Sequence, residues 1–310
     1  MINARKSDTV LITGASGFIG SAISESMNTE YRVVTANHKE FELEKYDETY
    51  GMIEKFKPRI LINATGRVAG IQGNLDNPTE LLATNARIAL NISKAAHELN
   101  VAHVIQFASA CIYPLNEITP SKPTDIGKGA IEESSKSYAL SKLLAIQLFS
   151  AYRKQFGRQW ITVIPSNLYG TGDWNRGSQG HVASMLMERF SKATSDNVDE
   201  VEVWGDGQSL RNFLNVRDLA CAVKFVIDNK IWSEEVVNVC GEPEVTIKEL
   251  AKLMAGVTHF KGKIMFDKSK PNGARRKILD DSYIRNFGWR PSISLSDGFL
   301  DYYESYQSNL

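Results

Sequence analysis

The chain has 310 residues, of which 43% are hydrophobic, and this size predicts one large domain with a smaller lobe. Its 36 Lys and Arg side chains balance its 36 Asp and Glu side chains, which excludes a global field that attracts nucleic acid or an anionic membrane. No apolar stretch approaches the roughly 18 residues of a membrane span, and residues 1–8 are polar, unlike a signal peptide. The three cysteines lack metal-ligand spacing, so we expect a protein of the reducing cytoplasm with no metal site.

The first predicted element is a short apolar strand, Val10–Ile12, that runs into a glycine-rich turn and then a helix. Gly14 permits a sharp turn, Gly17 lets the backbone approach a phosphate, and Gly20 lets the helix pack closely on the sheet. Amides at the helix N-terminus, together with the positive end of its dipole, suit the pyrophosphate of a dinucleotide. The residues expected to contact the cofactor here are Gly14, Ser16, Gly17, Phe18, Ile19 and Gly20. The Gly-x-x-Gly-x-x-Gly spacing is typical of the short-chain dehydrogenase/reductase form of this site; alternatively, the corner binds nothing.

The second predicted strand, residues 31–35, bears on the choice of dinucleotide. A carboxylate just past its end would hydrogen-bond the adenosine ribose and repel a 2′-phosphate. The chain instead has Asn37, His38 and Lys39 there, with no acidic residue until Glu40. This favours NADPH over NADH, unless Lys39 is simply a solvated side chain.

Helices and strands alternate over the next part of the chain. A helix over 47–56 precedes a third strand, 59–63, and the small residues Ala64, Thr65 and Gly66 after it suit close approach of a cofactor. Strands 101–107 and 160–164 and long helices 77–99 and 137–156 continue the alternation, which predicts a doubly wound parallel Rossmann sheet. Helix 77–99 is expected to pack on the sheet and against a second subunit. The residues predicted to share its apolar face are Leu81, Leu82, Ile88, Ile92 and Ala96.

The composition changes after Pro165, where a smaller lobe is expected to begin. We predict that residues 1–168 plus about 213–240 form the dinucleotide-binding domain, and about 169–212 plus 241–310 a discontinuous α/β substrate lobe. Loop 169–180 is followed by helix 181–193 and strand 201–204, and helix 217–228 and strand 236–239 return to the main sheet. Segments 246–255 and 263–266 and the terminal helix 294–306 complete a lobe that would close over ligands at the carboxyl ends of the strands.

Tyr138 and Lys142 carry the strongest catalytic signal. They stand at positions i and i+4 of helix 137–156, so both can point at one cofactor. A phenol normally titrates at about 10, and a neighbouring ammonium favours the phenolate, which brings proton transfer toward the working pH. Ser109, at the end of the fourth strand, can hold a substrate carbonyl oxygen while a hydride arrives. The alternative is an ordinary surface pair on an amphipathic helix.

Further stretches carry a resemblance that runs almost from end to end. They are Ser109–Pro114, Tyr138–Lys142, Pro165–Gly170, His181–Val182, Arg189–Phe190, Val203–Gly205, Arg211–Leu214, Ser269–Gly273, Arg276–Lys277 and Leu279–Asp280. Together with the glycine-rich turn, they are similar to the extended short-chain dehydrogenases/reductases, the NAD-dependent epimerase/dehydratase family. Within it, the chain most resembles the bifunctional enzymes that epimerise C3 and C5 of a GDP-4-keto-6-deoxymannose and reduce its C4.

The resemblance implies five catalytic residues. Tyr138 would donate a proton to the C4 oxygen, and Ser109 would orient that oxygen. Lys142 would tune the pKa of Tyr138 and bind the ribose of the cofactor. Cys111 and His181 would be the base and acid that invert the carbons beside the ketone. A hydrogen-bonded carbonyl acidifies those carbons, and inversion needs groups on opposite faces of the ring. Without the resemblance, Cys111 reads as a buried apolar thiol and His181 as a helix cap or surface residue.

The resemblance also implies ligand contacts in the second half of the chain. Beside the nicotinamide these are Pro165, Asn167 and Leu168, with Lys142 and His181 also touching the cofactor. The residues implied for the nucleotide sugar are Asn167, Val182, Leu186, Arg189, Trp204, Arg211 and Lys277. Cationic side chains suit a diphosphate and the indole suits a nucleotide, whereas without the resemblance the cations would be solvated.

The chain also departs from the family pattern. Ser16 stands where the family often has an arginine, which removes one expected contact to a 2′-phosphate. Ala110 and Cys111 follow the strand-four serine where dehydratases carry an acidic residue, and this argues against dehydration. Segments 77–92 and 169–180 differ more from the family pattern, so the resemblance does not identify the nucleotide base or the sugar of the substrate.

The expected function is NADPH-dependent epimerisation and reduction of a GDP-4-keto-6-deoxymannose-type sugar to GDP-L-fucose or a close relative, in a homodimer with a four-helix interface. A first alternative is a 4-reductase or single-site epimerase–reductase acting on another nucleotide 4-keto-deoxysugar, such as a GDP-deoxyheptose or a colitose-type, CDP- or dTDP-sugar. A second is a redox-sensing protein that binds a dinucleotide without turnover, which the Tyr138–Lys142 pair disfavours.

Overall fold

The computed structural model describes residues 8–115, 120–173, 181–270 and 272–308. Its largest element is a six-stranded parallel sheet in the order β2-β1-β3-β4-β5-β9. The strands are β1 (Thr9–Thr13), β2 (Arg32–Ala36), β3 (Ile60–Asn63), β4 (His103–Phe107), β5 (Ile161–Pro165) and β9 (Val236–Val239). Every residue of the inner strands β3 and β5 and of the edge strand β9 is buried, as expected for a parallel sheet that helices cover on both faces.

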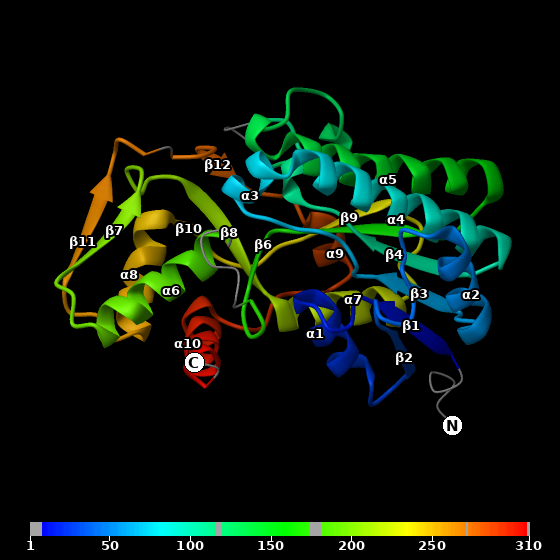
Figure 1. The fold of residues 1–310 in the computed structure, drawn as a ribbon, viewed down its shortest axis with the longest axis horizontal. Helices are drawn as coiled ribbons and strands as arrows, with labels where there is room; N and C mark the ends of the chain where they lie inside the picture. The colour runs from blue at the N-terminus through cyan, green and yellow to red at the C-terminus, as the bar shows by residue number, and fades with distance from the viewer. Residues whose placement is uncertain (1–7, 116–119, 174–180, 271, 309–310) are drawn as a thin grey trace.

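Helices cover both faces of this sheet (Figure 1). On one face α1 (Phe18–Met27) packs against α7 (Val216–Asp228); α2 (Tyr46–Phe56), α4 (Pro78–Glu98) and α5 (Lys136–Phe156) lie on the other. The alternation of side chains along β1 explains the two layers, because Val10 and Ile12 pack with α1 and α7 whereas Leu11 packs with the opposite helices. The predicted doubly wound parallel sheet is confirmed. Within the described residues, no helix is long and apolar enough to cross a membrane.

The second lobe has its own sheets and its own core. One sheet has the order β10-β8-β12, with β6 also pairing with β8, and the other is the pair β11-β7. The strands are β6 (Asn167–Tyr169), β7 (Glu200–Trp204), β8 (Leu210–Asn215), β10 (Glu244–Thr246), β11 (Lys263–Asp267) and β12 (Arg276–Lys277). Helices α6 (Val182–Ser195), α8 (Ile247–Val257) and α10 (Leu295–Gln307) contribute most of the core, in which Phe190, Phe213 and Phe299 are fully buried.

The predicted helices and strands end within two residues of those in the structure. The sequence did not predict several short elements, namely α3 (Ile71–Asp76), β6, β8, β10, β12 and α9 (Ser282–Asn286). The prediction that Leu82 shares the buried face of α4 was wrong, because Leu82 is 37% exposed while Leu81 is 3% exposed. Consecutive helical residues point about 100° apart, so only one of the two can face the sheet. Strand β8 spans the predicted boundary at about residue 213, and the exact division into domains stays a prediction.

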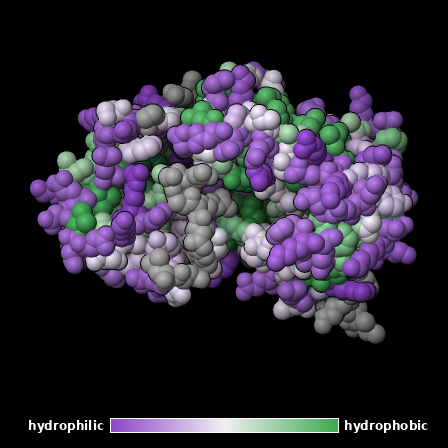
Figure 2. Space-filling model, viewed as in Figure 1, coloured by the Kyte–Doolittle hydropathy of each residue, from purple (hydrophilic) through white to green (hydrophobic). Residues whose placement is uncertain are grey.

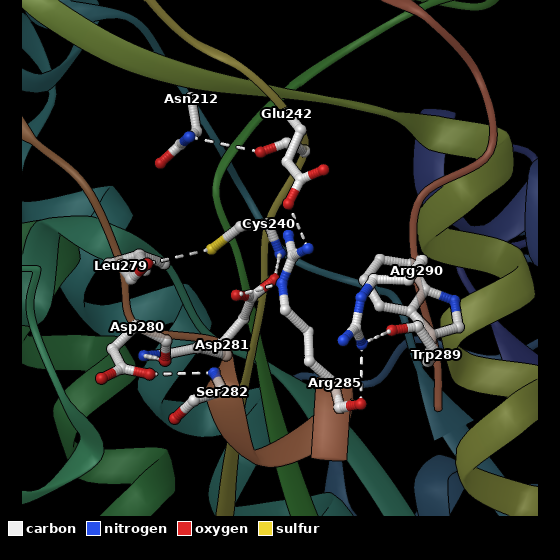
Figure 3. Close-up of polar contacts among 12 residues, drawn as sticks. Asn212, Cys240, Glu242, Leu279, Asp280, Asp281, Ser282, Arg285, Trp289 and Arg290 are labelled. Carbon is white, nitrogen blue, oxygen red and sulfur yellow. Dashed lines mark hydrogen bonds and ion pairs between the residues drawn. The ribbon is translucent and has the colours of Figure 1, made fainter. Parts of the chain in front are cut away.

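A polar cluster around Arg285 fastens α9 to the end of β9 (Figure 3). The Arg285 Nε donates to the Asp281 Oδ1 at 2.6 Å, and its guanidinium also pairs with Glu242. The other carboxylate oxygen of Asp281 accepts from the Cys240 amide at 3.3 Å. Because Cys240 directly follows β9, this cluster fixes the chain where it leaves the large sheet and enters the second lobe.

Candidate active site

The glycine-rich turn lies where the strand order changes direction, between β1 and β3, which is where open α/β sheets bind ligands. Gly14 has φ +68°, and a Cβ on it would lie 2.8 Å from the Ala64 carbonyl carbon. A Cβ on Gly20 would lie 2.2 Å from the Gly14 oxygen, and the Gly17 amide donates to that oxygen at 2.9 Å. The turn therefore requires glycine at both 14 and 20, and it brings residues 14–17 against residues 64–65.

The start of α1 fits the pyrophosphate of a dinucleotide. Gly17 is its N-cap and offers no side chain to the first amides of the helix, which leaves them for an anion. Beneath the turn, the Thr13 hydroxyl donates to Asn63 at 2.7 Å and Asn63 donates to Gln106 at 2.7 Å, so three neighbouring strands are tied together. The Thr65 hydroxyl is buried and has no partner among the described residues, as expected for a group that awaits a ligand.

A pocket of about 450 Å³ opens beside α1 and the end of β2, where the adenosine half of a dinucleotide is expected. Hydroxyl and amide side chains dominate its lining, which consists of Ala15, Ser16, Ser21, Ser24, Glu25, Asn28, Thr35, Ala36 and Asn37. The Asn37 Oδ1 accepts from the backbone amides of Lys39 at 2.9 Å and Glu40 at 3.2 Å, which shapes the loop after β2. His38 and Lys39 are exposed on this loop. The residues present fit a dinucleotide along both the glycine-rich turn and this pocket.

Tyr138 and Lys142 lie together in the first two turns of α5. Both are buried, and the Lys142 ammonium nitrogen lies 5.5 Å from the centre of the Tyr138 ring. A Cβ on Gly66 would lie 3.3 Å from the same nitrogen, so Lys142 reaches the loop that follows β3. Burial lowers the pKa of Lys142 to about 8, and the negative charge of a Cys111 thiolate opposes this shift.

Ser109 and Cys111 stand at the carboxyl end of β4. Ser109 is extended, and its hydroxyl accepts from the Cys111 amide at 3.5 Å, which caps the short 3₁₀ helix η2 (Ala110–Ile112). Cys111 is 7% exposed and belongs to the same apolar cluster as Tyr138. Burial raises the pKa of the Cys111 thiol, while Ser109 and the charges of Lys277 and Lys142 oppose that rise. The structure therefore brings Ser109, Cys111, Tyr138 and Lys142 into one neighbourhood.

His181 belongs to the second lobe, where it is the N-cap of α6 and exposed. Three implied substrate residues lie on α6, of which Val182 is half-buried, Leu186 is 3% exposed in the core of the lobe, and Arg189 is described below. Most of the loop predicted over 169–180 falls on residues 174–180, which lie outside the described residues.

Two cations implied for the substrate, Arg211 and Lys277, stand side by side as register partners on β8 and β12. The Lys277 ammonium donates to the Glu132 carboxylate at 3.1 Å. The charge of Lys277 also acts on Cys111, which joins this cation cluster to the catalytic neighbourhood. The sequence did not single out Glu132, and its place six residues before Tyr138 is the one signal that could have drawn attention to it.

A second group of implied substrate residues lies on β7 and α6. The Arg189 guanidinium donates to the Glu202 carbonyl at 3.0 Å and lies 5.5 Å from the centre of the Trp204 indole, which is 48% exposed. The Lys270 ammonium lies 5.8 Å from the same indole. An exposed indole beside two cations suits a planar base and its phosphates. Lys270 was not predicted as a site residue, although it stands in one of the stretches that carry the resemblance.

The chain between the lobes is held by backbone and amide contacts. Pro165 ends β5, Leu168 packs against the core of the large sheet, and the Asn167 amide donates to the Asn212 carbonyl at 2.9 Å. The surface is hollowed between the two lobes, and hydrophobic residues line part of that hollow (Figure 2). Among the described residues, no group of three or more His, Cys, Asp or Glu side chains is arranged to hold a metal ion.

A glycine-rich turn at the reversal of a parallel sheet, with a buried tyrosine–lysine pair beside it, defines a dinucleotide-dependent oxidoreductase. Residues 10–240 match the model of the NAD dependent epimerase/dehydratase family, and the chain belongs to that family.

Curated relatives match almost the whole chain. The chain is 37% identical to a putative GDP-L-fucose synthase 2 of Arabidopsis thaliana, over 98% of this chain and 93% of the relative. It is 33% identical to the GDP-L-fucose synthase of Escherichia coli K12, over 97% of both chains. It is also 32% identical to the GDP-L-colitose synthase of Yersinia pseudotuberculosis, over 93% of this chain and 94% of the relative.

Solved structures share the fold. A GDP-6-OMe-4-keto-L-xylo-heptose reductase from C. jejuni superposes with a TM-score of 0.89 over 98% of both chains, at 23% sequence identity. The two-lobed architecture described above is therefore that of known nucleotide-sugar enzymes.

Proposed function

We propose that this protein is an NADPH-dependent epimerase–reductase that converts a GDP-4-keto-6-deoxymannose-type sugar to GDP-L-fucose or a close relative, in the cytoplasm. The observation that carries the proposal is the full-length likeness to GDP-L-fucose synthases together with the cluster of Ser109, Cys111, Tyr138 and Lys142. NADPH, when bound along the glycine-rich turn, supplies the hydride that reduces the C4 ketone.

Tyr138 is the proton donor to the C4 oxygen. Its burial excludes water from the phenol, and the ammonium of Lys142 lies close enough to stabilise the phenolate that remains after the transfer. Ser109, extended at the end of β4, donates a hydrogen bond to the same oxygen and so polarises the ketone.

Cys111 and His181 exchange the protons on C3 and C5. The carbons beside a polarised ketone are acidic enough for a thiolate to act as base, and the charges of Lys277 and Lys142 favour the thiolate against burial. His181, on the opposite lobe at the start of α6, returns a proton from the other face of the ring. Arg211, Lys277 and Arg189 bind the diphosphate, and Trp204 packs on the base.

The test is solvent deuterium incorporation into a GDP-4-keto-6-deoxymannose incubated with the enzyme in D₂O without NADPH. The wild type should label both C3 and C5, as read by proton NMR. Cys111→Ser and His181→Ala should each lower labelling by about 100-fold or more, the ordinary contribution of a positioned acid or base. Unchanged labelling in both variants would contradict their assigned roles.

The relatives also favour a second candidate, a 4-reductase or single-site epimerase–reductase acting on a colitose-type sugar or a GDP-deoxyheptose. The number of deuterium atoms separates the two candidates. Two labelled carbons support the main proposal, one supports a single-site enzyme, and none supports a simple reductase.

We also propose a homodimer that pairs α4 and α5 of one protomer with the same helices of its partner. The two helices pack along each other and expose three leucines, Leu82, Leu90 and Leu140, each at least 37% exposed. The test is sedimentation of the wild type and of Leu90→Glu. The wild type should sediment as a dimer and the variant as a monomer, and a monomeric wild type would contradict the proposal.

A further inference from the structure

A carboxylate stands in the cation cluster that the proposed function assigns to the substrate diphosphate. The Glu132 Oε2 accepts from the Lys277 ammonium at 3.1 Å, and the two side chains are 23% and 24% exposed. The other carboxylate oxygen accepts from the Ser134 hydroxyl at 3.3 Å. The negative charge of Glu132 repels the diphosphate that Arg211 and Lys277 attract. The presence of a carboxylate in this binding site therefore needs an explanation.

The explanation begins with the sheet of the second lobe. Arg211 and Lys277 are register partners on the neighbouring strands β8 and β12, so their side chains leave the same face of the sheet side by side. Like charges in that arrangement destabilise a sheet. Glu132 lies close enough to both cations for its charge to act on each of them, and it offsets their repulsion in the free protein.

The backbone on either side of Lys277 is held by bonds other than the ion pair with Glu132. The Ser121 amide donates to the Ile278 carbonyl at 2.9 Å and the Asp280 amide donates to the Ser121 carbonyl at 2.8 Å. The Leu210 amide likewise donates to the Arg275 carbonyl at 2.9 Å. Glu132 therefore adds charge to the cluster and little to the course of the chain.

Glu132 is ionised at neutral pH. Partial burial raises the pKa of its carboxyl, but the charge and hydrogen bond of Lys277, the Ser134 hydroxyl and the charge of Arg211 outweigh that effect and lower it overall. Its full negative charge is thus present when a nucleotide sugar arrives.

We propose that Glu132 is a built-in counter-ion for Arg211 and Lys277, which takes the place of the diphosphate in the free enzyme and weakens nucleotide binding so that the product can leave. This inference rests on the proposed function, because it requires a diphosphate to bind these two cations. Glu132 is a positioning residue that acts on the ligand through the charge it presents to Arg211 and Lys277.

The experiment measures the Kd of GDP by titration calorimetry on the full-length protein. Glu132→Gln keeps the shape and a hydrogen-bond acceptor for Lys277 but removes the charge. We expect it to bind GDP about tenfold more tightly, the effect of removing one partly screened charge. KM for the nucleotide sugar should fall as well, while kcat stays unchanged or falls because product leaves more slowly. A purely structural residue would not tighten binding.

The chain offers a matched control at the next position. Glu133 is 82% exposed and pairs with Lys136 away from the cluster, so Glu133→Gln should leave the GDP affinity unchanged. In a Lys277→Met background, adding Glu132→Gln should change the affinity less than about threefold, because part of the charge that Glu132 offsets is gone.

Unchanged or weaker GDP binding by Glu132→Gln would overturn the inference. If that variant does not fold, Glu132→Ser should show the same tightening, and failure of both to fold would overturn the inference by assigning Glu132 a structural role. If the wild type binds none of GDP, UDP, CDP and dTDP, the proposed function fails with it. If the wild type binds a nucleoside diphosphate and the variant binds it no better, this inference alone fails.

Discussion

At the scale of single residues, the chemistry depends on a lysine that is buried but charged. Lys142 is 6% exposed, and burial lowers its pKa to about 8. The ammonium is therefore present below that pH and is lost as the pH rises through about 8. Since the proposed role of Lys142 is to stabilise the Tyr138 phenolate, its deprotonation removes that support.

The pH profile of kcat/KM tests this role, because that ratio reports the titration of the free enzyme. We predict that kcat/KM for reduction falls as the pH rises through about 8, in proportion to the loss of the ammonium. The measurement is the initial rate of NADPH oxidation at low substrate, in buffers of constant ionic strength. A profile that stays flat well above the pKa of Lys142 would contradict the account.

The sequence was most informative about functional residues that could be recognised from their spacing along the chain. Tyr138 and Lys142 could be paired from an i, i+4 spacing on one helix, and Gly14 and Gly20 from the turn they allow. The contact between Glu132 and Lys277 could not be predicted, because 145 positions separate them and they meet only where the large-sheet domain packs against the second lobe. The local sequence around a polar loop residue does not indicate which distant side chain that residue contacts.

At the scale of elements, the turn before α1 tolerates no side chain at Gly20. A Cβ there would lie 2.2 Å from the Gly14 carbonyl oxygen, so Gly20→Ala must push the turn away from the helix. We predict at least a tenfold loss of NADPH affinity, measured by nucleotide fluorescence, because the amides no longer converge on the pyrophosphate.

Gly51 is the matched control, since it lies inside α2 with nothing within 4 Å of its Cβ position. Gly51→Ala should stabilise the protein by up to about 1 kcal/mol, from helix propensity alone, and leave the NADPH affinity unchanged. Equal effects of the two substitutions would contradict the role given to the turn.

The Arg285 cluster gives a prediction about stability (Figure 3). Arg285→Met leaves Asp281, which is 8% exposed, without the cation that neutralises it. We expect a loss of about 2 kcal/mol, equivalent to a fall in Tm of about 3 °C in differential scanning calorimetry.

Arg217 provides the comparison, because it pairs with Asp301 on the surface, where the side chains are 53% and 47% exposed. Arg217→Met should cost no more than about 0.5 kcal/mol, as exposed ion pairs contribute little. A Tm loss for Arg285→Met as small as that for Arg217→Met would contradict the role of the cluster.

The same contrast explains which elements the sequence could predict. The strands and long helices of the large sheet have strong apolar patterns, such as the run Ile60–Asn63, and they were predicted within two residues. Strand β8 was missed because it carries Arg211, Asn212 and Asn215, and its strand form depends on pairing with β6, β10 and β12. The strand conformation of β8 therefore depends on pairing with neighbouring strands rather than on its local sequence.

At the scale of the whole molecule, the proposed function requires the two lobes to act on one ligand. The large sheet and the helices that flank it carry the glycine-rich turn, Tyr138 and Cys111, and the second lobe carries His181, Arg189 and Lys277. The two-lobed α/β organisation could be predicted from the sequence. The exact course of the chain between the lobes could not, because it is fixed by contacts among residues far apart, such as the one between Asn167 and Asn212.

The most direct test of the account is NADPH oxidation by the purified protein with a panel of nucleotide 4-ketosugars, with the products identified by proton NMR. We predict rapid oxidation with GDP-4-keto-6-deoxymannose, formation of GDP-L-fucose or a close relative, and a loss of at least about 100-fold in Tyr138→Phe. No NADPH oxidation with any 4-ketosugar of the panel, or full activity in Tyr138→Phe, would contradict it.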